Sequence, residues 1–244
     1  MTTVPEHLSA PGALAAAGEL GPFFAVQPRP GPEWVRWPEL DAALPGRVAE
    51  VRGVLGAGPR SPDVEPRVAA SLVHLGLVAR LLSPVLGAAV VAGVLPVVPV
   101  EGVRVHLAGS NPIPLALADP TAVPVPRPTD VAAALAEHWL VPAVQPLGAA
   151  VRAAFGVSPT VLAGNVPSGM AGALRQVATA RPDLAARADA VLDALLAGPL
   201  TGTGRRRGNG SFVRASCCLF YRVPGAGTCG DCVLTERTAG SGGV

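Results

Sequence analysis

Four cysteines lie in one sixteen-residue segment, and this feature constrains the fold more than any other in the chain. The segment runs from Cys217 to Cys232 with the spacing C-C-x10-C-x2-C, and no cysteine precedes it. Free cysteines usually behave as small buried apolar residues, and such residues are scattered along a chain. Clustering of all four therefore indicates a cross-linked or metal-binding segment, which the rest of the chain presents.

Three chemistries use four clustered thiols: two disulfides, a zinc site or an iron–sulfur cluster. Disulfides need an oxidising compartment, and the N-terminus lacks the basic and apolar regions of a signal peptide, so we expect a cytoplasmic protein. Zinc sites of four cysteines usually have two C-x2-4-C pairs, and only Cys229 and Cys232 form one. A [2Fe–2S] cluster also takes four thiolates, which Cys217 and Cys218 can join if the backbone turns there. The spacing leaves cluster and zinc open and favours disulfides least.

Small residues surround these cysteines. Pro224, Gly225, Gly227 and Gly230 allow close backbone approach, so that N–H groups can point at sulfur and tune a cluster's potential. The three glycines also match the dinucleotide-binding pattern G-x-G-x-x-G. That pattern requires a preceding strand, a following helix and an acidic residue about 20 positions later, which this segment does not offer. We expect no nicotinamide site here.

The motif resembles the C-terminal site of the FhuF-like ferric iron reductases. The resemblance rests on the cysteine spacing, on Tyr221-Arg222 and on Gly227-Thr-Cys229-Gly-Asp-Cys232, and upstream on Gly164-Asn165-Val166-Pro167-Ser168. It covers about residues 163–234. It implies one [2Fe–2S] cluster held by Cys217, Cys218, Cys229 and Cys232. It also implies an oxidoreductase of iron acquisition that reduces an Fe(III)-siderophore to Fe(II) by one electron and releases the iron in the cytoplasm.

Such an enzyme needs an external electron donor, because the chain offers no flavin or nicotinamide site; we expect a ferredoxin or a separate reductase. Arginines near the motif are candidates for steering an anionic siderophore or donor, although a run of charge is often only a solvated loop. They are Arg205, Arg206, Arg207, Arg214 and Arg222. Two alternatives stay open: an electron-transfer or sensor [2Fe–2S] protein without a siderophore site, and an interaction protein with a structural zinc site.

Charge and hydropathy exclude other classes. The net charge of +2 gives no broad basic face for nucleic acid. Leu81–Val100 is twenty residues without a charge, which is long enough to span a membrane. Three prolines interrupt this run and no aromatic belt flanks it, so we expect a buried helix and strand. Peripheral contact with a membrane transporter remains open.

The remaining patterns predict an α+β fold, mostly helical with a small antiparallel sheet. We expect a scaffold over residues 1–200 and a linker with the cluster-binding segment over residues 201–244. A helix is expected to begin at Ser61-Pro62 and to end at Pro84. A strand is expected at Val103–Leu107, where apolar and polar residues alternate, and a second one at Ile113–Leu117, after the turn of residues 109–112.

Further along the chain, the predictions alternate between connectors and helices. Residues 122–128 are expected to be a proline-rich connector and residues 201–210 a flexible linker. Val161–Ala163 is expected to be a short strand, and Asn165 to cap the helix after it. His74 is expected to be a satisfied histidine rather than a metal ligand. Four aromatic residues near the N-terminus are expected to seal the core, or else to form a platform for a siderophore or a partner: Phe23, Phe24, Trp34 and Trp37.

Overall fold

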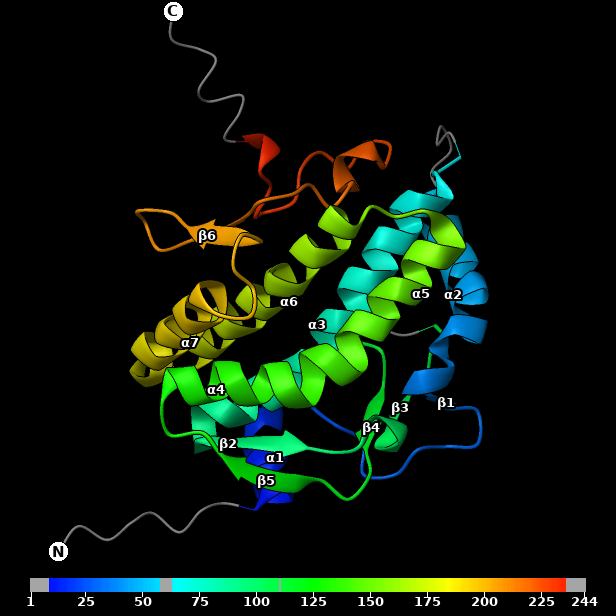
Figure 1. The fold of residues 1–244 in the computed structure, drawn as a ribbon. Coiled ribbons are helices and arrows are strands. Elements are labelled where there is room, and N and C mark those ends of the chain that lie inside the picture. Colours follow the sequence, from blue (N-terminus) through cyan, green and yellow to red (C-terminus); the bar gives the residue numbers. More distant parts are fainter. Residues whose placement is uncertain (1–8, 58–62, 110, 236–244) are drawn as a thin grey trace, which may run out of the picture.

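The computed structural model describes residues 9–57, 63–109 and 111–235. One long helix, α3 (Pro66–Ala92), runs through the middle, and the other helices surround it (Figure 1). Within these residues, four helices make most of the helix contacts with α3: α1 (Ala10–Gly18), α2 (Leu40–Leu55), α5 (Gln145–Phe155) and α6 (Pro159–Ala180). Helix α7 (Ala185–Ala197) packs on α6 and on α4 (Pro128–Leu135), and the π-helix η3 (Ala136–Val144) links α4 to α5.

Helix α3 is apolar enough and long enough to cross a membrane by length and composition alone. In this fold, however, 72% of its most apolar stretch is buried inside the protein. Leu77, Leu81 and Leu86 have no exposed surface. The apolar run that begins at Leu81 is thus the second half of a central core helix, followed by a strand, as the prolines and the missing aromatic belt predicted.

Small residues let the helices approach closely. A Cβ atom added to Gly169 of α6 would lie 3.1 Å from both Cα and Cβ of Ala79 on α3. A Cβ added to Gly87 of α3 would lie 2.7 Å from the Phe24 ring. A core built from Ala, Val and Leu holds few large side chains, so close backbone contacts of this kind supply much of its packing.

Over the described ranges, three small antiparallel sheets complete the α+β fold. The first has the order β1-β3-β4, with β1 (Val35–Arg36), β3 (Val103–Val105) and β4 (Leu115–Leu117). In the second, β2 (Val94–Val97) pairs with β5 (Thr121–Pro124), and in the third β6 (Gly204–Arg206) pairs with β7 (Phe212–Arg214). Four short 3-10 helices lie along the described part of the chain: η1 (Trp37–Glu39), η2 (Val100–Gly102), η4 (Pro182–Leu184) and η5 (Phe220–Arg222). The predicted fold class and the pairing of the two predicted strands are confirmed.

The predicted limits of the central helix are wrong. Of the expected start, Ser61 and Pro62 lie outside the described residues, and the helix begins at Pro66. Pro84 lies inside the helix, which continues to Gly93, where a φ of 68° ends it. A proline within a helix removes one backbone hydrogen bond. Burial of the apolar residues on both sides of Pro84 outweighs that loss.

Two other predicted segments differ as well. Val161–Ala163 is not a strand, and Asn165 does not cap a helix; both lie within α6, which begins at Pro159 after Ser158. A serine followed by proline is a helix-start signal, which the sequence analysis recognised at Ser61 but not here. The predicted connector after residue 121 begins as strand β5, because Val123 pairs with Leu95.

The predicted linker at residues 201–210 is also wrong. Gly204–Arg206 forms strand β6, and the chain then turns back into β7 (Figure 1). Gly204 faces the Phe212 ring so closely that a side chain at this position would overlap it. The cysteine segment therefore follows directly from an ordered hairpin. The division of the chain at residue 200 remains a prediction.

The N-terminal aromatic residues divide between the core and its edge. Phe24 and Trp37 are buried in the main core, and the Trp37 indole donates to the Ala143 carbonyl at 3.0 Å. Trp34 is half-buried with its ring centroid 6.1 Å from that of His106. The core-sealing role is confirmed for Phe24 and Trp37.

Candidate metal centre

The cysteine segment folds back over the ends of two helices immediately after strand β7. Leu219 has a positive φ of 71°, which turns the backbone at the adjacent cysteines and lets its own N–H donate to Cys217 Sγ at 3.3 Å. Similarly, the Leu234 N–H donates to Cys232 Sγ at 3.4 Å. Backbone donors to sulfur are thus present, but they come from the leucines two residues after a cysteine rather than from the glycines.

Two of the four thiols are already in contact. Cys218 Sγ and Cys229 Sγ lie 3.4 Å apart, which is too long for a disulfide bond of about 2.05 Å. Thiolates about 2.3 Å from one tetrahedral metal would be roughly 3.8 Å apart, so the pair is near that spacing. All four cysteines are free; Cys218 and Cys232 are buried, and the other two are half-buried. Within the described ranges, no three His, Cys, Asp or Glu side chains gather around one point.

The contact between these two thiols shifts their pKa values in opposite directions. The hydrogen bond between the two sulfurs lowers the pKa of Cys218 to about 6, and the Phe220 backbone N–H and the positive charge of Arg214 act in the same direction. The same hydrogen bond and burial raise the pKa of Cys229. Burial raises the pKa of Cys217 as well. Of the two contacting thiols, Cys218 thus loses its proton more readily than Cys229.

A buried polar chain, that is, a series of hydrogen-bonded side chains, links the first pair of cysteines to the helices of the core. The Ser71 hydroxyl of α3 donates to the Cys218 carbonyl at 2.9 Å. The Asn165 amide of α6 donates to the Ser71 carbonyl at 2.9 Å and lies 3.4 Å from His74 Nδ1. The Asn165 side-chain oxygen accepts from Arg214 Nη2 at 2.5 Å. Asn165 of α6 thus connects α3 and β7 next to the cysteine segment.

Arg214 lies in the interior, with only 1% of its surface exposed. Its Nε and Nη1 atoms are buried without a hydrogen-bond partner. Its backbone N–H donates to the Asp231 carbonyl at 3.1 Å, which ties the start of the segment to the turn between Cys229 and Cys232. Gly164 leaves room for this arrangement, because a Cβ there would overlap Ser216 Oγ and lie 3.5 Å from Arg214 Nη2.

A small apolar cluster fixes the other side of the segment. Val223 packs with Val64 and Val68 at the start of α3, and half-buried neighbours extend the contact. At the rim, Arg222 Nη2 lies 2.7 Å from a carboxylate oxygen of Glu65. The cysteine segment is therefore held by apolar packing, by an ion pair and by the buried polar chain.

The five predicted steering arginines have different environments. Arg206 pairs with Asp189 at 2.8 Å and lies 3.7 Å from Asp193. The Arg207 N–H donates to Ser211 within the hairpin, and Arg205 lies on the exposed side of β6. Steering by the surface arginines stays a prediction. For Arg214 it needs correction, because its buried guanidinium cannot meet a partner at the surface.

Sequence reasoning missed the roles of Ser71 and Asn165. It treated His74 as satisfied, and His74 is buried beside Asn165, with its pKa lowered to about 4 by burial and by the charge of Arg214. One signal was present: Asn165 belongs to the Gly-Asn-Val-Pro-Ser segment that resembles the family's upstream segment. The structure shows what that segment does, since it brings an amide to the arginine that precedes the cysteines.

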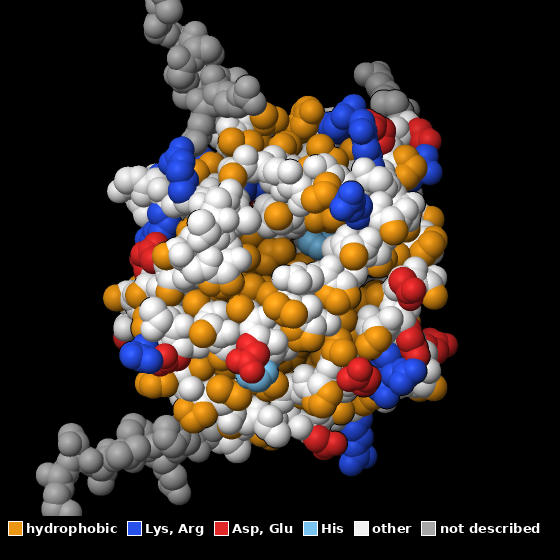
Figure 2. All heavy atoms as spheres, viewed as in Figure 1, with side chains coloured by type: hydrophobic (Ala, Val, Ile, Leu, Met, Phe, Trp, Pro, Cys, Tyr) orange, Lys and Arg blue, Asp and Glu red, His pale blue; other side chains and the backbone are white. Residues whose placement is uncertain are grey.

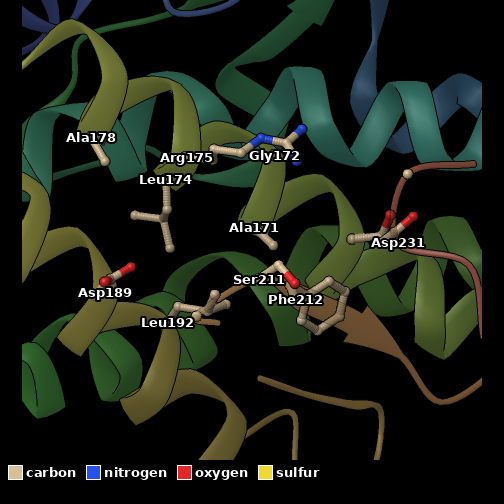
Figure 3. A pocket seen from close by; sticks show the side chains of 13 residues that line it. Ala171, Gly172, Leu174, Arg175, Ala178, Asp189, Leu192, Ser211, Phe212 and Asp231 are labelled. Carbon is tan, nitrogen blue, oxygen red and sulfur yellow. The ribbon is translucent and has the colours of Figure 1, made fainter. Parts of the chain in front are cut away.

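Two hollows adjoin the site. A cavity of about 240 Å³ lies between α6, α7 and the hairpin, and Gly230 and Asp231 of the motif line one end of it (Figure 3). A second, of about 250 Å³, lies between α5 and α6 and is lined by His74. Figure 2 shows the face of the molecule over these helices, where apolar side chains surround a hollow.

The comparison with protein families identifies the segment. Residues 214–234 match the family model of the FhuF 2Fe-2S C-terminal domain. The match begins at Arg214 and includes all four cysteines. No curated protein matches the chain. The chain therefore carries the C-terminal [2Fe–2S] site of FhuF-like proteins, and among the chemistries that spacing left open the cluster is confirmed.

Proposed function

We propose that this protein reduces the ferric ion of an Fe(III)-siderophore to Fe(II) by one electron. The match of residues 214–234 to the FhuF 2Fe-2S domain carries this proposal. A [2Fe–2S] cluster, when bound, supplies one electron at a time, which suits a one-electron change in the substrate iron. We assign the ligands as Cys217, Cys218, Cys229 and Cys232.

The residues of this chain fit such a cluster. They provide four thiols, and these are the only cysteines in the sequence. Backbone N–H groups donate to two of the sulfurs. The buried Arg214 guanidinium has two nitrogens without a partner, and a negatively charged group would satisfy the charge. The four proposed ligands are thus of one kind, and the strand that precedes them carries a buried positive charge.

The segment lies at the surface, which suits reduction of a bulky substrate. Cys217 and Cys229 are half-buried, and the Tyr221 side chain is 48% exposed. A ferric chelate can therefore approach the site without entering the core. The protein has no need of a general acid or base, because hard oxygen ligands that hold Fe(III) tightly hold Fe(II) far less well. The tasks of the chain are to position the thiols, to shield them and to set the potential.

An external donor completes the proposed reaction. We propose a ferredoxin or a separate reductase in the cytoplasm as this donor. We also propose that the protein itself makes peripheral contact with a membrane transporter. We propose that Arg222 at the rim of the segment and the arginines of β6 attract an anionic donor or siderophore. Bleaching of the visible spectrum by NADPH alone would contradict the need for an external donor.

The first experiment is anaerobic purification with a visible spectrum and with iron and sulfide analysis. We expect about two irons and two acid-labile sulfides per chain. Cys229→Ser should lose the visible absorption, whereas the matched variant Ser216→Ala, next to the motif, should keep it. Colourless protein that contains zinc would refute the assignment of the cluster.

The second experiment tests the substrate. Protein reduced with dithionite and freed of the excess should be reoxidised by a ferric hydroxamate, and an Fe(II)-specific chelator should capture one iron per chain. The gallium form of the same siderophore, which cannot be reduced, is the control. A reducible cluster that no ferric chelate reoxidises would support an electron-transfer or sensor protein instead.

A further inference from the structure

Arg214 carries a buried positive charge that no counter-charge among the described residues offsets. Its guanidinium is buried, and two of its three nitrogens lack a hydrogen-bond partner. The third donates to Asn165, a neutral amide. An isolated buried cation is strongly unfavourable unless an anion or several hydrogen bonds offset it. Such a residue persists only if something compensates the charge.

The protein groups around Arg214 do not compensate it. Asp231 is the nearest acidic residue in the segment, yet its buried Oδ2 atom is also without a partner, and no ion pair joins the two side chains among the described residues. His74, on the far side of Asn165, contributes no negative charge. The cysteines lie close along the chain, because Arg214 stands three residues before Cys217 and its backbone N–H donates to the Asp231 carbonyl in the turn before Cys232.

We propose that Arg214 is a positioning residue that compensates the negative charge of the cluster site and raises its reduction potential, with Asn165 holding the guanidinium in place. Reduction adds one electron, and therefore one negative charge, to the site. A fixed cation in a low-dielectric interior stabilises that added charge more than the oxidised state. This role of Arg214 rests on the proposed cluster and not on the siderophore reaction. A protein that binds the cluster but reduces no siderophore would therefore leave the role of Arg214 intact.

The test is a dithionite titration of the loaded protein, followed in the visible spectrum against dyes of known potential. Arg214→Gln should lower the potential, and Arg214→Lys, which keeps the charge, should restore most of it. Arg222→Gln is the matched control: it removes an exposed arginine of the same segment that already pairs with Glu65. Its potential should remain near the wild-type value, because water and salt screen surface charge.

Asp231→Asn distinguishes this role from a plain ion pair. If Arg214 serves the cluster, Asp231→Asn removes a nearby negative charge and raises the potential, opposite to Arg214→Gln. If Arg214 and Asp231 merely pair with each other, both variants lose stability and neither shifts the potential in these directions. An unchanged or raised potential in Arg214→Gln would overturn the proposal.

A variant and a measurement cover the case in which Arg214→Gln does not fold. Asn165→Ala keeps the charge but releases the guanidinium, and it should lower the potential by less than loss of the charge would. An unchanged potential there would overturn the positioning role. In addition, loading the cluster should raise the melting temperature of wild-type protein more than that of Arg214→Met, because only the wild-type apoprotein holds an uncompensated buried charge at this position. Equal increases would count against compensation.

Discussion

Asn165→Ala tests the buried polar chain that supports the site. The substitution removes the oxygen that accepts from Arg214 and the amide that donates to the Ser71 carbonyl. A hydrogen bond to a charged group contributes about 1.5–3 kcal/mol, and a neutral one about 1 kcal/mol. Alanine returns about 0.5 kcal/mol through its higher helix propensity inside α6. We expect the free energy of unfolding to fall by about 3 kcal/mol.

Urea unfolding of the apoprotein, followed by circular dichroism, measures this change without interference from the cluster. Asn209→Ala is the matched control, because Asn209 is exposed in the β6–β7 turn and its side chain bonds, among the described residues, only to Ser211. We expect that variant to lose less than about 1 kcal/mol. A loss below about 1 kcal/mol for Asn165→Ala would show that the asparagine does not hold the chain together.

A double-mutant cycle locates the effect. If most of the loss arises from the contact with Arg214, Asn165→Ala should cost much less when Arg214 is already glutamine. Equal losses in both backgrounds would place the contribution of Asn165 at Ser71 and His74 instead.

Two further predictions concern the scaffold. Gly169→Ala forces a methyl group to within 3.1 Å of Ala79 and should destabilise the protein by about 1–3 kcal/mol. Gly172→Ala on the same helix meets nothing within 4 Å and should stabilise the protein by up to about 1 kcal/mol. Thermal unfolding compares the two variants, and equal melting temperatures would contradict the close α3–α6 contact. His74 is held neutral with its pKa lowered to about 4, so the unfolded chain takes up its proton first as pH falls, and stability should decrease from about pH 6.5 towards 4 by about 1.4 kcal/mol per pH unit. His74→Gln should remove this part of the decrease, and an identical pH profile would refute the assignment.

The sequence predicted the site better than it predicted the path of the chain to the site. Cysteine spacing is a local property, so the four thiols and their neighbourhood could be read directly. The fold class followed from periodicity and from proline and glycine positions. The buried run after Leu81 was also recognised, because the prolines that weaken a membrane span are visible in the sequence.

Tertiary contacts decided the rest. Pro84 has a strong tendency to end a helix, but residues 80–90 around it are all buried, and this burial carries α3 past the proline. Asn165 fits a helix cap by residue type, and only the approach of α3 and β7 makes it a buried bridge. Arg214 looked like a surface charge beside a charged run, and nothing local shows that β7 turns its side chain inward. Asn165 and Arg214 were misjudged because their partners lie far away in the chain.

The bond between Ser71 and Cys218 spans 147 positions of the chain, and this separation sets an order of assembly. Ribosomes add about 5–20 residues per second, so roughly 7–30 s pass between the synthesis of the two residues. During this interval the first turns of α3 can fold, but Val64 and Val68 lack the valine that later covers them. Docking of the cysteine segment is therefore a late event in biogenesis. The nascent scaffold must remain soluble with Val64 and Val68 uncovered until the cysteine segment has been synthesised.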